Sequence, residues 1–237
     1  MRLAALRQRN SLILHDADSL CDAPGTHQFE PSLFTAEYWR ERGLIVGEAP
    51  GRGNSLFLQA TPNEQWALRA YRRGGMVAKL NDKRYLWAGA ERTRAFRELR
   101  LTATLLELGL PVPRPVAGCV NRFGFFYEAA LITVRINGAQ TLAERFAKDS
   151  VNRTLLQQVG VMIKRFHQAG LDHVDLNARN ILIDPSDTPW LIDFDRCRLR
   201  APGNWQANNL DRLARSLEKL QAGSAIHLIK TGYNQKT

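Results

Sequence analysis

Three oxygen-bearing side chains in the second half of this 237-residue sequence have a spacing that suits a reactive site. Asp175 and Asn180 are separated by four residues in the segment His173–Asn180, and Asp193 ends the apolar run that begins at Trp190. One carboxylate can accept the proton of a hydroxyl group, while an amide oxygen and a second carboxylate can hold Mg²⁺. These residue types predict phosphoryl transfer, with Asp175 as the catalytic base and Asn180 and Asp193 as magnesium ligands.

The elements around these side chains must bring them together. Two apolar runs after Asn180 are predicted to form a short hairpin that returns Asp193 to the loop, thirteen positions later. An Asp–Asn pair alone is weak evidence, because both residues are common in turns, and a solvated hairpin turn is the alternative interpretation. The pattern His-x-Asp-x-x-x-x-Asn, together with a correctly spaced third ligand, favours the phosphoryl-transfer loop.

A helix predicted over residues 150–168 delivers the chain to this loop. Its apolar residues recur at helical spacing and form one buried face. His167 lies just past that face and is interpreted as a helix-end residue rather than a catalyst.

Upstream strands are predicted to form a lobe that binds a nucleotide. Strand-like runs cover residues 43–47, 55–58 and 65–71, and the first two enclose a turn with Gly51-Arg52-Gly53. Glycine lets a backbone approach closely, so the N–H groups of such a turn can lie over phosphates. Two glycines in a hairpin turn are weak evidence by themselves, and their value comes from lying upstream of the loop at Asp175.

A cation at the end of the third strand is expected to face the nucleotide phosphates. Arg69 is the preferred residue, because it can bind phosphate through two donors, and Lys79 is the rival. A helix predicted over residues 91–108 contains Glu98. Glu98 either pairs with Arg69 or offsets Arg94 or Arg97 on the helix surface, and the sequence leaves both interpretations open.

The composition is that of an ordinary globular protein, with 44% hydrophobic and 24% charged residues. No run of eighteen apolar residues is present, so no membrane-spanning helix is predicted. The N-terminal apolar run Leu12-Ile13-Leu14 is too short for a signal peptide, which predicts a protein that stays in the cytoplasm. Three cysteines without metal-ligand spacing are expected to be reduced structural thiols: Cys21, Cys119 and Cys197.

The formal net charge of +10 implies an anionic partner, and the bases are unevenly distributed. The window from Ala67 to Arg100 contains ten bases against three acids, an excess of +7. Nucleic acid, an anionic membrane surface and a polyanionic substrate all suit such a window, and a solvated basic face is the alternative. The neighbouring Tyr85-Leu86-Trp87 suits a membrane interface.

Three segments together resemble a known family: residues 66–75, 173–180 and 193–198. Over about Gly43 to Leu220 the chain resembles the lipopolysaccharide-core sugar kinases, and within them most narrowly those acting on 3-deoxy-D-manno-octulosonic acid (Kdo). The resemblance implies an α+β, two-lobed protein-kinase-like fold. An antiparallel-sheet lobe with one helix is expected over residues 1–136, and a mostly helical catalytic lobe over residues 137–237.

The resemblance also implies an activity. It is the ATP-dependent phosphorylation of a Kdo hydroxyl on Kdo-lipid A precursor in lipopolysaccharide biosynthesis, with ATP and Mg²⁺. The protein is expected on the cytoplasmic side of the inner membrane as a peripheral protein, with neither nucleic acid nor an obligate protein partner. Five bases are expected to contact the acceptor's phosphates and carboxylate or the membrane: Arg72, Arg73, Lys79, Lys83 and Arg84.

By the same resemblance, Asp175 is the base, Asn180 and Asp193 hold magnesium, and four residues belong to the nucleotide lobe: Gly51, Gly53, Arg69 and Glu98. Two positions depart from the protein-kinase pattern. Asp195 replaces the glycine of the Asp-Phe-Gly motif, and Asn177 stands where protein kinases carry lysine.

The stretch after Asp193 favours a non-protein acceptor. A helix predicted over residues 208–220 begins about fifteen residues later, which leaves no room for the long segment with which protein kinases hold a peptide. Asp211 on that helix either braces the loop or favours the helix dipole. A kinase of a core heptose or of another small molecule is the first alternative, and a basic nucleic-acid-binding module is the second.

Overall fold

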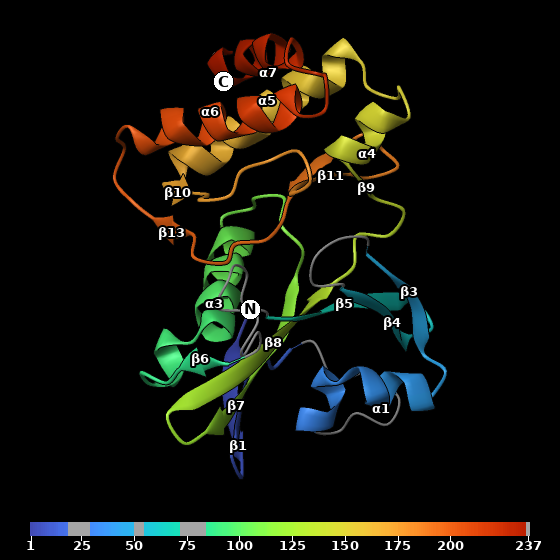
Figure 1. The fold of residues 1–237 in the computed structure, drawn as a ribbon, viewed down its shortest axis with the longest axis vertical. Coiled ribbons are helices and arrows are strands. Elements are labelled where there is room, and N and C mark those ends of the chain that lie inside the picture. The colour runs from blue at the N-terminus through green and yellow to red at the C-terminus, as the bar shows by residue number, and fades with distance from the viewer. Residues whose placement is uncertain (19–28, 50–54, 72–83, 236–237) are drawn as a thin grey trace. The chain divides into compact units, whose positions relative to one another are not determined.

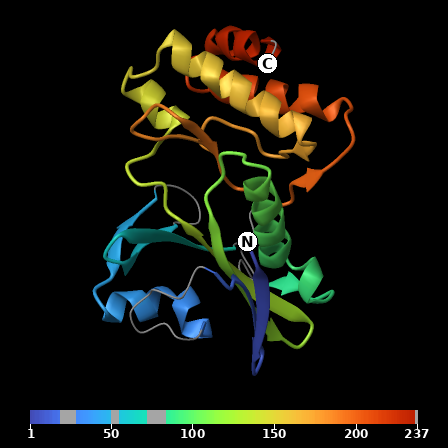
Figure 2. The same ribbon diagram turned by 180° about the vertical axis from the view of Figure 1, so that it is seen from behind.

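The computed structural model describes residues 1–18, 29–49, 55–71 and 84–235. They form two units: unit 1 comprises residues 1–103 and 114–135, and unit 2 comprises residues 104–113 and 136–237. Unit 1 is built on an antiparallel sheet and unit 2 is mostly helical, which confirms the predicted α+β class. Figure 1 and Figure 2 show the elements from two opposite sides.

The sheet of unit 1 has the strand order β1-β2-β7-β8-β5-β4-β3, and β6 also pairs with β8. All of its pairings are antiparallel. Its strands are β1 (Leu3–Gln8), β2 (Ser11–Asp16), β3 (Ile45–Glu48), β4 (Leu56–Thr61), β5 (Glu64–Ala70), β6 (Tyr85–Leu86), β7 (Pro115–Phe123) and β8 (Phe126–Val134).

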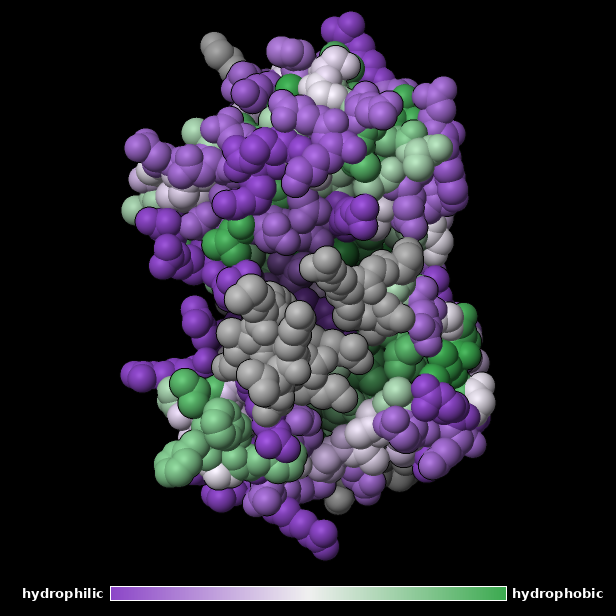
Figure 3. Space-filling view, viewed as in Figure 1, coloured by the Kyte–Doolittle hydropathy of each residue, from purple (hydrophilic) through white to green (hydrophobic). Residues whose placement is uncertain are grey.

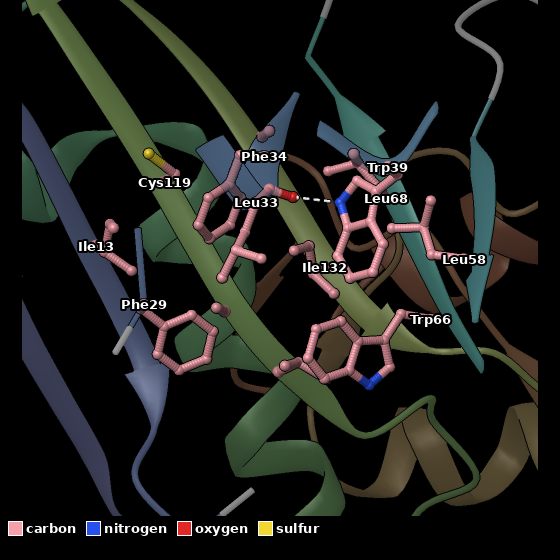
Figure 4. Close-up of a cluster of buried hydrophobic side chains, with 13 residues drawn as sticks. Ile13, Phe29, Leu33, Phe34, Trp39, Leu58, Trp66, Leu68, Cys119 and Ile132 are labelled. Atoms are coloured by element: carbon pink, nitrogen blue, oxygen red, sulfur yellow. Dashed lines mark hydrogen bonds between the residues drawn. The ribbon is translucent and has the colours of Figure 1, made fainter. Parts of the chain in front are cut away.

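One face of this sheet is covered by the segment before β3. The short helix η1 (Pro31–Phe34) leads to α1 (Ala36–Glu41), whose first turn is capped by the Thr35 hydroxyl. Trp39 of α1 is buried and donates its indole N–H to the Leu33 carbonyl oxygen, at 2.8 Å (Figure 4). Both side chains pack among strand residues such as Trp66 and Ile132. A buried aromatic with its polar atom satisfied anchors this segment.

The opposite face packs on α3 (Arg94–Glu107), which follows the short helix η2 (Ala90–Arg92). Phe96 and Leu99 of α3 are buried against every second residue of the strands, such as Val120 and Leu131. Because successive side chains of a strand point to opposite faces, neighbouring residues of β7 and β8 alternate between the core under α1 and the core under α3. Helix α3 therefore lies where its buried residues, including Glu98, face β5 and β8.

Unit 2 contains four helices among the described residues: α4 (Leu142–Ala147), α5 (Arg153–Gln168), α6 (Trp205–Glu218) and α7 (Ala225–Asn234). Its strands form two small sheets, β12-β11-β9 and β10-β13. Their bounds are β9 (Gln140–Thr141), β10 (Leu171–Asp172), β11 (Ile181–Ile183), β12 (Pro189–Leu191) and β13 (Arg198–Leu199).

Two glycines allow α5 and α7 to pack with their backbones in contact. A Cβ atom at Gly160 would lie 2.0 Å from the Ile229 carbonyl oxygen, and one at Gly232 would lie 1.9 Å from that of Gln157. No side chain fits at either position without moving a helix. This close packing fixes α5, the helix that leads into the loop of Asp175.

The structure adds to the sequence expectations in three places. Residues 3–16 form the hairpin β1–β2, which extends the sheet but has few buried side chains and gave no clear pattern. Residues 123–133 have a strand-like sequence throughout, yet Gly124 and Phe125 form the turn between β7 and β8 and interrupt the run. Helix α6 begins at Trp205, three residues earlier than predicted.

Two expectations from the composition can be compared with the described residues. Cys119 and Cys197 are buried, as expected for structural thiols, and burial raises the pKa of Cys119 to about 12. Cys21 lies outside the described residues. In the described part of the chain, no helix is both long and apolar enough to span a bilayer.

Candidate active site

The loop between β10 and β11 carries Asp175 on its surface. Asp175 is exposed, while its neighbours His173 and Leu176 are buried. Asn177 organises the loop around it: its side-chain oxygen accepts the N–H of Arg179 at 2.8 Å, and its amide group donates to the Asp175 carbonyl oxygen at 3.0 Å. Such side-chain-to-backbone bonds two residues apart are typical of Asn in turns. The Asp175 carboxylate is thereby held on a fixed backbone and left accessible.

Asn180 connects this loop to the strand that ends at Asp193. Its side-chain amide donates to the Asp175 carbonyl oxygen at 2.9 Å. Its own carbonyl oxygen accepts the N–H of Ile192 at 3.0 Å. The side-chain oxygen of Asn180 therefore points away from the Asp175 carbonyl. The backbone of Asn180 is at the same time bonded to Ile192, the residue before Asp193.

The peptide of Ile192 is held from both sides. Besides the bond from its N–H to Asn180, its carbonyl oxygen lies 3.0 Å from Nε2 of the buried His173. Asp193 follows directly, with φ of +64°, a left-handed conformation that aspartate tolerates better than most residues. The structure thus brings the backbones of Asp175, Asn180 and Asp193 together, joined by hydrogen bonds.

His173 is a buried polar residue at the centre of this arrangement. Burial lowers its pKa, although the bond to Ile192 and the charges of Asp193 and Asp175 act in the opposite direction. The imidazole is therefore neutral, and Nε2 carries the proton that it donates to the Ile192 oxygen. The ring also lies edge-on to Phe194, with centroids 5.6 Å apart. His173 positions the strand and does not face the surface.

Helix α6 braces the loop from the interior. The side-chain oxygen of Asn209 accepts the His173 N–H at 2.9 Å, and the Ser216 hydroxyl accepts the Ala178 N–H at 3.1 Å. Arg212 donates to the carbonyl oxygen of Val174. Sequence reasoning chose this helix but named Asp211, which is exposed. Asn209, Arg212 and Ser216 lie beside the apolar residues of α6. A polar residue at a core-facing position of a helix is the sequence signal that could have identified Asn209.

A buried carboxylate stabilises the strand before the loop. Asp172 accepts from Arg200 at 2.9 Å and from the Asn209 amide at 3.1 Å, so Asn209 connects Asp172 and His173. Arg198, paired with Asp172 across β10 and β13, lies 3.9 Å away. A buried charge that is paired and hydrogen-bonded is tolerated, which explains an aspartate in a buried strand.

In unit 1 the predicted ion pair between Arg69 and Glu98 is present. Glu98 lies on α3 with 4% of its surface exposed, and Arg69 lies on β5. Tyr71 donates its hydroxyl to the other oxygen of Glu98, and the Arg69 guanidinium lies 4.9 Å from the Tyr71 ring centroid. The alternative in which Glu98 offsets Arg94 or Arg97 is wrong, because the Glu98 side chain points inward. Sequence reasoning missed Tyr71.

Several predicted residues lie outside the described part of the chain. They are Gly51, Arg52 and Gly53 of the glycine turn and the bases Arg72, Arg73, Lys79 and Lys83. The choice between Arg69 and Lys79 as the phosphate-binding cation therefore stays a prediction. Arg84 is exposed and lies 3.8 Å from Glu128. Tyr85, predicted at a membrane interface, is buried among the α3 contacts, whereas Leu86 is exposed.

The donor set at the loop suits a hard divalent cation. Asn180 and Asp193 offer an amide oxygen and a carboxylate, and Mg²⁺ is commonly bound by one or two carboxylates together with substrate phosphates and water. Among the described residues no three His, Cys, Asp or Glu side chains gather as an all-protein metal site. The residues present therefore fit magnesium that is bound jointly with phosphate.

Comparisons with known proteins agree with the geometry of the loop. Residues 36–233 match the Lipopolysaccharide kinase (Kdo/WaaP) family. A 3-deoxy-D-manno-octulosonic acid kinase of Xylella fastidiosa (strain M12) is 46% identical over 211 residues, which cover 89% of this chain and 84% of that protein. Proteins of the same name are 44% identical in Vibrio vulnificus (strain YJ016), over 84% of both chains, and in Stenotrophomonas maltophilia (strain R551-3), over 90% of this chain and 85% of that protein. With its Asp–Asn loop and its match over most of the sequence, this chain belongs to the lipopolysaccharide kinase (Kdo/WaaP) family.

Proposed function

We propose that this chain is an ATP-dependent kinase that phosphorylates a hydroxyl group of Kdo on a Kdo-lipid A precursor. The printed names of its relatives, 3-deoxy-D-manno-octulosonic acid kinase, support this acceptor. The observation that carries the proposal is the double hydrogen bonding of Ile192, which ties Asp193 to the loop of Asp175 and Asn180. Two carboxylates and one amide are thereby carried by backbone segments that are hydrogen-bonded to one another.

The proposed reaction assigns the proton transfer to Asp175. The acceptor hydroxyl oxygen forms a bond to the γ-phosphorus of ATP, and the bond from that phosphorus to the β–γ bridging oxygen breaks, so that ADP leaves. The hydroxyl proton passes to the Asp175 carboxylate, which is exposed and therefore reachable by a sugar. The bonds that Asn177 and Asn180 donate to the Asp175 backbone keep the carboxylate in place during the transfer.

Asn180 and Asp193 would hold Mg²⁺ through the side-chain oxygen of the first and the carboxylate of the second. A bound magnesium ion supplies positive charge to the phosphate oxygens during transfer. The chain's own contribution is to orient both ligands. Asn180 is fixed by its amide bond to the Asp175 carbonyl, and Asp193 by the anchored peptide of Ile192.

In unit 1, Arg69 is proposed to bind the phosphates of ATP. Its guanidinium is held by Glu98 and lies over the ring of Tyr71, so its orientation is set before a nucleotide arrives. The turn at Gly51-Arg52-Gly53 is proposed to cover the phosphates, as the resemblance implies. The role of Arg69 is supported by its ion pair with Glu98, and the role of the glycine turn by its place between the strands β3 and β4.

A short connection after Asp193 supports a non-peptide acceptor. Residues 194–204 alone lie between Asp193 and helix α6, and they include the two-residue strand β13. Protein kinases use a much longer segment at this place to hold a peptide. A sugar acceptor needs no such platform.

The acceptor is part of a lipid, so the protein is proposed to act as a peripheral protein on the cytoplasmic side of the inner membrane. Arg72, Arg73, Lys83 and Arg84 are proposed to contact phosphates of the acceptor or of the bilayer. Of these, Arg84 is described and exposed. Each base near an anionic leaflet contributes about 1 kcal/mol of attraction.

The decisive experiment measures phosphate transfer from ATP to Kdo-lipid A precursor in the presence of Mg²⁺. Asp175→Asn is expected to lower the turnover rate by about 10²–10⁴-fold, because proton transfer is lost while the loop's backbone bonds remain. Asp211→Asn is the matched control, since it makes the same change at an exposed carboxylate of α6. Equal activity of the two variants would contradict the role of Asp175.

A second acceptor separates Kdo from the other sugars of the core. The same preparation is offered the Kdo-lipid A precursor and a heptosylated core at equal concentrations. Faster transfer to the precursor is expected. Transfer only to the heptosylated core would keep the kinase chemistry and refute the acceptor.

A further inference from the structure

The end of the unit 1 sheet at which β6, β7 and β8 meet exposes an unusual group of apolar side chains. Eight large hydrophobic residues of the described chain are exposed, and four of them lie here: Leu86, Phe123, Phe125 and Phe126. The exposed fractions of Phe125 and Leu86 are 83% and 68%. These four residues, here called the hairpin tip, correspond to the green area at the lower left of Figure 3, over β6 and the β7–β8 turn. Single exposed apolar residues are normal, whereas contiguous groups mark contact surfaces.

The strand register makes the hairpin tip one continuous surface. Leu86 pairs with Phe126, and Phe126 pairs with Phe123. Directly opposed residues of antiparallel strands point to the same face, so these three side chains lie in a row across three strands. Phe125 occupies the two-residue turn next to Gly124, and its carbonyl oxygen accepts the N–H of Trp87 at 2.9 Å.

Folding of unit 1 does not require these side chains. The other face of the same strands is already filled, because Tyr85 and Tyr127 are buried with residues of α3. Their rings pack at 5.4 Å, which fixes β6 on β8 from the inside. The apolar residues of the hairpin tip therefore add nothing to that core, which leaves them available for a contact outside the folded chain.

The charges around the hairpin tip identify the kind of partner. The guanidinium of exposed Arg84 lies 5.8 Å from the Phe123 ring centroid and 3.8 Å from the Glu128 carboxylate, and that of exposed Arg122 lies 5.0 Å from the Trp87 ring. The adjacent turn between β1 and β2 adds the exposed Arg9, whose neighbour Asn10 accepts the Arg122 N–H at 2.9 Å. Arg122 pairs with Tyr127 and therefore starts from the opposite face of the strands to Phe123. Aromatic residues flanked by arginines suit the boundary between phospholipid headgroups and acyl chains.

We propose that the hairpin tip, rimmed by Arg9, Arg84 and Arg122, docks this chain onto an anionic phospholipid bilayer. Phe125 and Phe126 enter the interface, and the three arginines contact the lipid phosphates. The inference rests on the proposed function, since it names the surface by which the kinase reaches a lipid-linked acceptor. The membrane contact is assigned to the hairpin tip of unit 1, and the phosphoryl transfer to the loop of unit 2.

Co-sedimentation with vesicles tests the proposal. The full chain is mixed with vesicles of phosphatidylcholine alone or of phosphatidylcholine with phosphatidylglycerol, and the bound fraction is measured. The wild type is expected to bind the mixed vesicles at least about tenfold more tightly, because three bases face the anionic surface. Phe125→Ser/Phe126→Ser is expected to lose at least about tenfold in affinity for the mixed vesicles.

Matched variants keep this test specific. Leu108→Ser removes another exposed apolar side chain, one of unit 2, and should bind like the wild type. The thermal midpoint of Phe125→Ser/Phe126→Ser should match that of the wild type, because both side chains are exposed. Arg84→Gln/Arg122→Gln should lose binding to the mixed vesicles and show a weaker salt dependence.

Three outcomes would overturn the proposal. The first is equal vesicle binding by the wild type and the phenylalanine variant. The second is equal binding to neutral and anionic vesicles. The third is a self-associating wild type whose dimer, rather than its vesicle binding, is lost in the phenylalanine variant, which would make the tip a contact between copies.

Failure of the docking surface and failure of the proposed kinase activity are distinguishable. Transfer to detergent-dispersed Kdo-lipid A precursor needs no bilayer, so the phenylalanine variant should retain wild-type turnover in that assay. Vesicle binding that depends on the tip, together with absent transfer, would refute the acceptor and leave the docking surface standing.

Discussion

The loop around Asp175 and the ion pair of Arg69 with Glu98 position their polar side chains in different ways. In the loop, residues that do no chemistry fix the backbone: Asn209 and Ser216 of α6 accept its N–H groups, and Asn177 caps its turn. In the ion pair, Glu98 is buried and Arg69 is three-quarters buried, and the same charges that would serve the nucleotide also hold β5 to α3.

In the loop, the residue proposed to do the chemistry is therefore not needed for stability. In the ion pair, the same residues are needed for both stability and the proposed nucleotide binding. Asp175 is exposed and its carboxylate supports none of the bonds that shape the loop, so replacing it should leave the fold intact. Arg69 neutralises a buried carboxylate, so replacing it should weaken both the fold and nucleotide binding.

Arg69→Met is expected to have the largest effect on stability. Removing a cation from a buried carboxylate typically costs about 3–5 kcal/mol, and methionine keeps much of the volume of the arginine stem. Urea denaturation should therefore show a lower free energy of unfolding, while Asp175→Asn changes it by less than about 0.5 kcal/mol.

The double variant Arg69→Met/Glu98→Gln is the control for this prediction. It removes the buried negative charge together with its partner and keeps an oxygen that can accept the Tyr71 hydroxyl. It should be more stable than Arg69→Met alone. A double variant that is less stable than the single one would show that charge burial is not the cause.

The second prediction acts on unit 2 through His167, at the end of α5. Burial lowers the pKa of His167 from 6.5 to about 4, and its Nδ1 lies 2.9 Å from the Tyr233 hydroxyl. Below pH 6.5 the unfolded chain binds a proton that the folded chain takes up only near pH 4. The free energy of unfolding should therefore decrease as the pH falls from 6.5 to 4, by up to about 3 kcal/mol.

His167→Gln separates this effect from the titration of carboxylates. Glutamine stays neutral and can still bond to the Tyr233 hydroxyl. Denaturation at pH 7 and at pH 4.5 should show a smaller decrease for the variant than for the wild type. Parallel decreases in the two proteins would exclude His167 as the source.

The contrast between the two regions also explains what the sequence could predict. The spacing of Asp175, Asn180 and Asp193 is informative because they lie in one segment and the hairpin that follows it, where local rules of turns and strands apply. Arg69 and Glu98 are 29 positions apart, and the sequence offered their pairing only beside the alternative in which Glu98 offsets Arg94 or Arg97; the structure decided between the two. The fold class came from the resemblance to the lipopolysaccharide-core sugar kinases.

The positions that escaped prediction depend on tertiary packing. Asn209 bonds to His173 across 36 positions, and no local pattern assigns that contact. The hairpin β1–β2 has mostly half-buried or exposed side chains, so its apolar alternation is weak. The exposed row of Leu86, Phe126 and Phe123 became visible only when the register of three strands was known.

The third prediction removes one brace of the loop. Asn209→Ala leaves the buried His173 N–H without its acceptor and takes one donor from Asp172. An unsatisfied buried polar group costs about 2 kcal/mol, so the free energy of unfolding should decrease by that amount. Turnover should also fall, because His173 holds Ile192 next to Asp193. Unchanged turnover in a destabilised variant would show that the brace serves stability alone.

The smallest expected effect on stability comes from Asn177, the residue that caps the loop's turn. Asn177→Ala removes the acceptor of the Arg179 N–H and a donor to the Asp175 carbonyl, near the surface, at a cost of about 1 kcal/mol. Asn177→Asp keeps the acceptor and loses the donor, so it should recover most of the stability. If the loop separates positioning from chemistry, the alanine variant loses turnover well beyond its loss of stability, because Asp175 and Asn180 are no longer fixed on one backbone. Turnover that falls only in proportion to the unfolded fraction would contradict that division of roles.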